Sequence, residues 1–260
     1  MDILAKAKIR EGGNIKLGAN MGSWAMLFGN VDWYSPELGR SCKGTCRGNC
    51  KGCFDKNNPK KSACYVAKSY VMRTHRNEDG TPGDILKNRC SVKYGHMINT
   101  IAMTEHRKEL KKSLDVQLTN KKKKFDIIRI NESGELTCKE DFKLWCFLAA
   151  KHPETVFYLY TKNYNAIKGS RIPRNLFVNV SIWHEVGIKE YLEMKDDPQI
   201  RAFVLVDDEY TRDVYKKKGV VITSMCSAYD ENGKMNHAVT CEKCKKCFSN
   251  RSKVVGCFSH

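Results

Sequence analysis

The sequence lacks a long apolar run. No stretch approaches the roughly 18 consecutive apolar residues that a membrane-spanning helix needs, and residues 1–13 lack the apolar centre of a secretory signal peptide. Internal repeats, low-complexity tracts and linkers rich in proline and glycine are absent as well. These absences predict one main folded domain that has no membrane partner and stays in the cytoplasm.

Negative charge is also scarce. The chain has 29 Asp and Glu residues against 46 Lys and Arg, which gives a formal net charge of +17. A positive field of this size attracts phosphate-rich partners. The densest basic runs, residues 108–112 and 121–124, flank a predicted helix, where such runs usually form a solvated face. The charge therefore leaves nucleic-acid binding as an alternative and does not establish it.

Cysteine, in contrast, is abundant and unevenly distributed. Of the 13 cysteines, five lie between residues 42 and 64, five between residues 226 and 257, and three lie between these groups. Without an export signal we expect a reducing compartment, where clustered cysteines indicate metal or thiol chemistry more often than disulfides.

Short apolar runs alternate with helical stretches, a pattern typical of β-α units and a parallel sheet. Candidate strands cover residues 23–28, 125–131, 156–163, 176–183, 202–208 and 219–225, and candidate helices cover residues 62–73, 91–118, 139–151, 184–195 and 209–217. Six right-handed units close most of a barrel. We therefore predict an α/β fold with a parallel-stranded, partial TIM-like (β/α)6 barrel over residues 1–225, and a cysteine-rich C-terminal extension, residues 226–260, packed on it.

The C-terminal cysteines have C-x2-C-x2-C spacing at Cys241, Cys244 and Cys247. Such spacing lets one tight loop present three thiolates to a single iron-sulfur cluster, and thiolates this close repel one another unless a cation neutralises them. Cys226, at the end of the last candidate strand, is the predicted fourth ligand. Zinc, which also accepts four thiolates, is the alternative metal. The rival fourth ligands are Cys257 and His260.

The N-terminal cysteines form a C-x3-C-x2-C loop at Cys46, Cys50 and Cys53, between the first candidate strand and the first candidate helix. Here the sequence resembles the radical S-adenosylmethionine superfamily, in which such a loop holds three irons of a [4Fe-4S] cluster and leaves the fourth iron to the cofactor. Cys64 and Cys42 are additional candidate ligands.

A second stretch is similar to the same superfamily. The strand ending at residue 131 runs into Ser133, Gly134 and Glu135, which resemble the Gly-Gly-Glu motif that holds the amino group of S-adenosylmethionine. The resemblance implies that these three residues bind the cofactor.

Polar residues follow several candidate strands, where parallel α/β folds concentrate their chemistry. Glu132, His184 and Asp207 are the candidate catalytic residues. Glu132 can act as an acid or base, although loop glutamates are commonly helix caps, and His184 can serve as a general base within reach of Asp207, although a lone histidine usually has no such role.

Over most of its length the chain is similar to a family of bacteriophage proteins known as gene product eighty-eight. The matching stretches are the N-terminal cysteine loop with residues 64–65, residues 128–135, residues 157–162, the C-terminal cysteine triplet and the final histidine. The resemblance implies a phage protein of the host cytoplasm with an iron-sulfur cluster, and it implies no particular reaction.

Three functions remain open. The leading hypothesis is an iron-sulfur enzyme that binds one or two [4Fe-4S] clusters, acts on a small-molecule substrate at the carboxyl face of the barrel and, in its most concrete form, uses S-adenosylmethionine. The second is a cluster-containing hydrolase or lyase that needs no such cofactor. The third is a metal-stabilised protein that binds nucleic acid through its basic surface.

Overall fold

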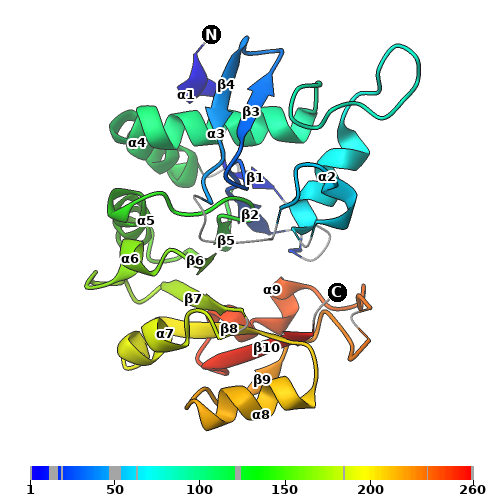
Figure 1. Ribbon diagram of the computed structural model, residues 1–260. Coiled ribbons are helices and arrows are strands. Elements are labelled where there is room, and N and C mark those ends of the chain that lie inside the picture. Colours follow the sequence, from blue (N-terminus) through cyan, green and yellow to red (C-terminus); the bar gives the residue numbers. More distant parts are fainter. Residues whose placement is uncertain are drawn as a thin grey trace.

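A computed structural model describes residues 2–11, 17–18, 20–46, 54–62, 64–120, 124–183, 185–232 and 234–258. Its centre is a sheet whose described strands have the order β1-β2-β5-β6-β7-β8-β10-β9, parallel except between β1 and β2 (Figure 1). The strands are β1 (Arg10–Glu11), β2 (Met21–Ser23), β5 (Ile127–Ile130), β6 (Val156–Thr161), β7 (Leu176–Ile182), β8 (Ile200–Val206), β9 (Ser224–Met225) and β10 (Val254–Phe258), with a separate hairpin of β3 (Asp32–Ser35) and β4 (Arg40–Lys43).

The helices are α1 (Ile3–Lys6), α2 (Tyr65–Arg73), α3 (Ser91–Glu105), α4 (Arg107–Thr119), α5 (Lys139–Lys151), α6 (Tyr164–Ile167), α7 (Ile188–Met194), α8 (Glu209–Lys217) and α9 (Cys241–Cys244), with short 3-10 turns η1 (Pro59–Lys61) and η2 (Lys246–Phe248). None of the described helices is long and apolar enough to cross a membrane.

The predicted α/β class with a mostly parallel sheet is confirmed. Strands β5 to β8 lie side by side in chain order, as expected for β-branched and aromatic runs buried on both faces. The predicted helix over residues 91–118 is interrupted at His106, whose backbone leaves the helical region (φ −131°, ψ 35°). The bend brings Arg107 to Asp141 at the start of α5, with a 2.7 Å ion pair.

The sixth predicted strand, residues 219–225, does not lie beside β8 as the predicted barrel requires. Residues 219–225 contribute only the two-residue strand β9, and β10 lies between it and β8. Five residue pairs join β10 to β8, because residues 254–258 are a continuous, mostly buried apolar run, whereas β9 offers two residues for pairing. Within the described residues no pairing joins β1 to β9, so closure into a TIM-like (β/α)6 barrel is not observed.

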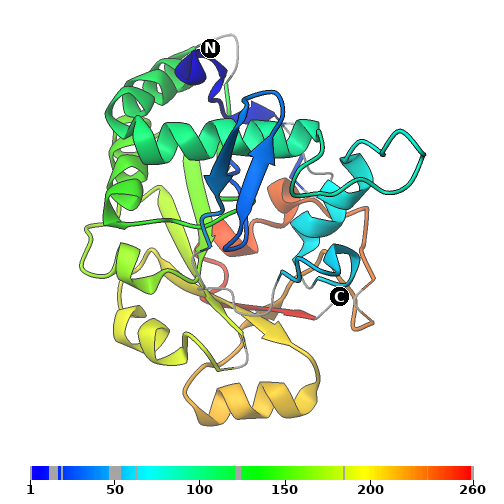
Figure 2. The same cartoon turned by 45° about the horizontal axis from the view of Figure 1, so that its top comes forward.

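The two faces of the sheet have different coverings because successive strand residues point to opposite sides. One face packs on α4, α5, α7 and α8 through the main apolar core. On the other face, Tyr158 and Phe177 pack on Phe248, with Cys241 and Cys247 beside them. We call this second side the cysteine face. In Figure 2 the orange-red segment containing α9 lies on the opposite side of the sheet from α5, α7 and α8.

A buried histidine makes stability depend on pH. His96 of α3 hydrogen-bonds the Tyr70 hydroxyl at 2.9 Å inside the core beneath α2. Burial, with a smaller contribution from the charge of Arg10, lowers the pKa of His96 from 6.5 to about 3. In this pH interval the unfolded chain binds a proton that the folded chain does not, so the folded state loses stability as the pH falls below 6.5.

We therefore expect His96→Gln to flatten the dependence of the unfolding free energy on pH. Between pH 4.5 and 6, the slope should fall by up to about 1.4 kcal/mol per pH unit, the contribution of one proton. Urea unfolding of both proteins across this interval measures the difference. If the unfolding free energies of the two proteins had the same dependence on pH, His96 would not be the group responsible.

Candidate metal centre

The C-terminal cysteines lie in one tight turn. The Thr240 side chain caps α9 by accepting the Lys243 N–H, and the Lys245 N–H donates to the Cys241 carbonyl at 2.9 Å. Lys245 then adopts a left-handed conformation (φ 58°), which reverses the chain into η2 and Cys247. The sequence C-x2-C-x2-C thus forms a compact loop, as its spacing predicts.

The structure brings Cys226 to the same place. Its backbone N–H donates to the Gly256 carbonyl of β10 at 2.6 Å, which fixes Cys226 at the end of β9. Burial raises the pKa of Cys247 to about 12, and negative charge on Cys226, Cys241 and Cys244 raises it further. The other three predicted C-terminal ligands are therefore each close enough to Cys247 for their charges to act on it.

Hydroxyl donors of β6 face these sulfurs. The Tyr160 hydroxyl donates to the Cys247 thiolate, which offsets part of the rise in the pKa of Cys247. The Tyr158 hydroxyl is fully buried and has no hydrogen-bond partner among the described residues. Burial raises its pKa well above the ordinary value, and charge on Cys241 and Cys247 contributes, so this donor lies near the sulfurs. A buried donor without an acceptor costs about 1–3 kcal/mol, which an anionic group at the thiols would offset.

The arrangement differs from that of a single bound ion. In the part of the chain that the structure describes, no three His, Cys, Asp or Glu side chains are grouped so that they could hold one metal ion. Four thiolates around zinc each lie about 2.3 Å from the same atom. The thiolates of an iron-sulfur cluster each bind a different iron and stand further apart.

The N-terminal group is described only in part, since Cys50 and Cys53 lie outside the described residues. The Gly29 N–H donates to the Cys46 sulfur at 3.2 Å, and Cys64, at the start of α2, accepts the N–H groups of Val66 and Ala67. Burial nevertheless raises the pKa of Cys46, to about 12, and that of Cys64.

Charged neighbours act on these two thiols. Negative charge on Cys64 and Glu135 raises the pKa of Cys46, and the Lys162 cation lowers the pKa of both thiols. Cys46 and Cys64 are therefore neighbours, and both pack against the apolar cluster that contains Phe28 and Trp33. Cys42, on β4, interacts instead with Arg40, Glu105 and Asp32.

The three residues predicted to bind S-adenosylmethionine are engaged within the protein. The Ser133 hydroxyl donates to the Met26 carbonyl at 2.8 Å, and Gly134, with φ +79°, approaches Thr45 so closely that a Cβ would lie 2.6 Å from its hydroxyl. The buried Glu135 carboxylate accepts hydrogen bonds from the Leu136 N–H, the Thr161 hydroxyl and the Lys162 N–H at 2.6–2.8 Å. This carboxylate ties the end of β5 to the end of β6.

A family model described as gene product 88 matches residues 5–252. The chain belongs to the gene product 88 family. The match includes Cys46, Cys50, Cys53 and Cys64 and also Cys226, Cys241, Cys244 and Cys247, and it agrees with the predicted phage origin. Comparisons with curated proteins and with solved structures give no match, and none of the comparisons supports the radical S-adenosylmethionine resemblance.

Of the candidate catalytic residues of the gene product 88 chain, the structure describes Glu132 and Asp207. Glu132 is half-buried, and its charge acts on the Tyr158 hydroxyl, which places it toward the cysteine face. Asp207 is exposed where β8 ends, and His184 lies outside the described residues. Tyr158 and Tyr160, which strand burial alone assigns to the core, prove to be neighbours of the thiols.

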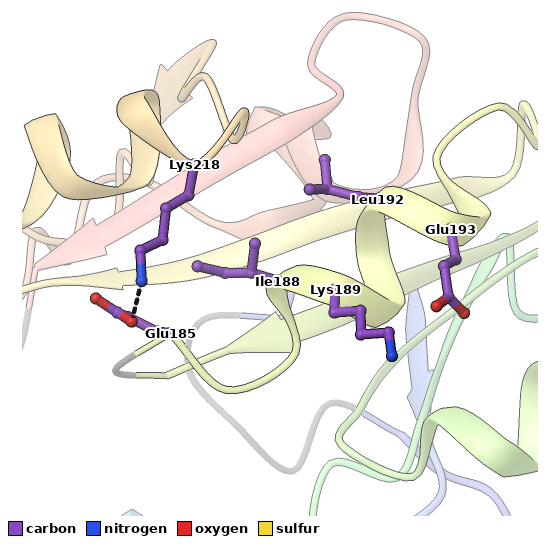
Figure 3. Close-up of a pocket in the computed structure, with 6 residues that line it drawn as sticks. All are labelled: Glu185, Ile188, Lys189, Leu192, Glu193 and Lys218. Atoms are coloured by element: carbon purple, nitrogen blue, oxygen red, sulfur yellow. Dashed lines mark hydrogen bonds and ion pairs between the residues drawn. The ribbon is translucent and has the colours of Figure 1, made fainter.

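The hollow in Figure 3 belongs to the opposite face of the gene product 88 fold. It is lined by Glu185, Ile188, Lys189, Leu192, Glu193 and Lys218, around α7 and the end of α8. Lys218 forms an ion pair with Glu185 at its rim. Among the residues that the structure describes, none of the predicted ligands or catalytic residues lines this hollow.

Proposed function

We propose that this gene product 88 protein is an iron-sulfur protein with [4Fe-4S] clusters at its two cysteine groups. Cys226, Cys241, Cys244 and Cys247 hold the C-terminal cluster. One observation carries the proposal: the other three thiols and the Tyr160 hydroxyl act on Cys247, and the Tyr158 hydroxyl on the same face has no hydrogen-bond acceptor among the described residues. The N-terminal ligands are Cys46, Cys50, Cys53 and Cys64.

Nearby donors offset part of the effect of burial, which disfavours the thiolate form of these sulfurs. Tyr160 donates to Cys247, Gly29 donates to Cys46, and the first N–H groups of α2 donate to Cys64. Donors of this kind stabilise thiolates and raise the reduction potential of a bound cluster. When bound, a [4Fe-4S] cluster supplies one-electron transfer or, where an iron is accessible, Lewis-acid chemistry.

Reconstitution tests this proposal directly. Anaerobic incubation with ferrous iron and sulfide, followed by desalting, should yield a brown protein that retains iron and sulfide in equal amounts. A colourless, folded protein that retains zinc alone would overturn the iron-sulfur assignment in favour of a zinc site.

The reaction we propose needs no S-adenosylmethionine. Two observations support this form: Cys64 is a fourth thiol prepared beside Cys46, and Glu135 already accepts three hydrogen bonds from the protein. A fourth thiolate closes the iron site that the cofactor requires. A hydrolase or lyase at the carboxyl edge of the sheet, with Glu132 as its acid or base beside Tyr158, fits this arrangement.

We accordingly expect no S-adenosylmethionine binding by the reconstituted protein in isothermal titration calorimetry, and no 5'-deoxyadenosine after reduction. The same assay on Cys64→Ala is the informative comparison, since this variant opens an iron site. Cofactor cleavage by the wild-type protein would contradict a closed N-terminal cluster.

A further inference from the structure

Arg201 is a buried cation on the cysteine face. It is 1% exposed, and its guanidinium lies over the Phe177 ring at 4.5 Å. Its hydrogen bonds go to the carbonyls of Ser249 (2.7 and 3.2 Å) and Pro198 (3.1 Å) and to the Asn250 side-chain oxygen (3.1 Å). All of these acceptors are neutral. Among the described residues, no carboxylate lies within ion-pair distance of Arg201.

A buried charge without a counter-ion destabilises the folded state, and repulsion from a second cation, Lys253, adds to that cost. Arg201 lowers the pKa of nearby Lys253, so the two positive charges interact. The groups whose negative charge acts on Arg201 are Cys247 first and Tyr191 second. Cys247, a proposed cluster ligand, is therefore within electrostatic reach of this guanidinium, and a negatively charged group bound there would compensate its charge.

The backbone geometry links Arg201 to the same cluster. Arg201 and Asn179 are paired residues of the neighbouring strands β8 and β7. The Asn179 amide donates to the Cys247 carbonyl at 3.0 Å, while Arg201 binds the carbonyl two residues further along. Together they hold residues 247–250 against the sheet.

We infer that Arg201 is the counter-ion and positioning residue of the C-terminal cluster. It fixes the chain that carries Cys247, and it compensates the negative charge of the bound cluster. This inference rests on the proposed function. A [4Fe-4S] cluster with four thiolates is anionic, and one electron taken from an external reductant makes it more negative. A buried cation beside it stabilises the reduced form more than the oxidised form.

Redox titration of three variants tests the inference. Arg201→Met should make reduction by dithionite at least tenfold less favourable, which is a fall of about 59 mV for a one-electron couple. Arg201→Lys keeps the charge and should stay near the wild-type potential. Arg40→Met removes an exposed arginine paired with Glu105 and is the control for total charge. A wild-type potential in Arg201→Met would overturn the inference.

A stability cycle covers the case in which Arg201→Met does not load a cluster. Chelator-treated wild type and Arg201→Gln are unfolded with urea, beside the loaded forms of the wild type, Arg201→Gln and Arg201→Lys. The loss of the Arg201 hydrogen bonds should lower the stability of Arg201→Gln in both states, and a counter-ion role predicts a larger loss in the loaded protein than in the chelator-treated protein, with Arg201→Lys still loading a cluster. Equal destabilisation with and without the cluster, or failure of Arg201→Lys to load, would make the role of Arg201 merely structural. Absence of iron from the wild type would refute the proposed function itself, a result distinct from both.

Discussion

Cys247→Ala should abolish the C-terminal cluster. Tyr160 and the other three cysteines act on the Cys247 sulfur, and the Asn179 amide donates to the Cys247 carbonyl. Without it, the loop presents two thiolates beside Cys226, and the Tyr158 and Tyr160 donors face no anion. We expect anaerobically reconstituted Cys247→Ala to lose one cluster's share of iron and sulfide. Its loaded form should also lose several kcal/mol of stability, because metal-binding free energy at such sites is folding free energy.

The matched control is Cys146→Ala. Cys146 is a partly buried thiol, packed against the main core on the other face of the sheet, and burial raises its pKa to about 12 as it does for Cys247. Its removal should leave the iron and sulfide contents at wild-type values. Equal metal contents in all three proteins would contradict ligation by Cys247.

Glu135→Ala should be strongly destabilising. The carboxylate accepts three hydrogen bonds in the interior, and its removal leaves the Thr161 hydroxyl and the N–H groups of Leu136 and Lys162 without an acceptor. At about 1–3 kcal/mol for each orphaned donor, we expect a loss of roughly 3 to 5 kcal/mol in urea unfolding.

Glu135→Gln separates this structural role from cofactor binding. The amide keeps one oxygen for two of the donors, so its loss of stability should be intermediate. Exposed Glu231→Ala is the control and should change stability by less than about 0.5 kcal/mol. If Glu135 served mainly to hold a cofactor, Glu135→Ala would fold with wild-type stability.

Local patterns predicted much of the fold because burial on both faces leaves near-continuous apolar runs. Strands β5 to β8 and helix α5 follow from such runs. The order of the last strands did not follow. Residues 254–258 come after the cysteine triplet in the chain, and only their pairing with β8 reveals that they complete the sheet. Pairing partners depend on tertiary packing, which periodicity does not encode.

The cysteine part of the site was predictable, because closely spaced cysteines indicate metal ligation. The cysteine spacings predicted the compact C-terminal loop, and the structure brings Cys226 beside it. The groups that surround the sulfurs were missed. Tyr158 and Tyr160 look like core residues in an apolar strand, and alternation alone does not say which face meets the cysteines. Arg201, an arginine within an otherwise apolar strand, was the available signal.

The central claim is that the crowded thiols hold iron-sulfur clusters, and metal and sulfide analysis with Mössbauer spectroscopy tests it most directly. Protein purified without oxygen from cells grown on iron-57 should contain iron and acid-labile sulfide in equal amounts, with the spectrum of [4Fe-4S] centres. Well-folded protein that contains neither iron nor sulfide under these conditions would contradict the account.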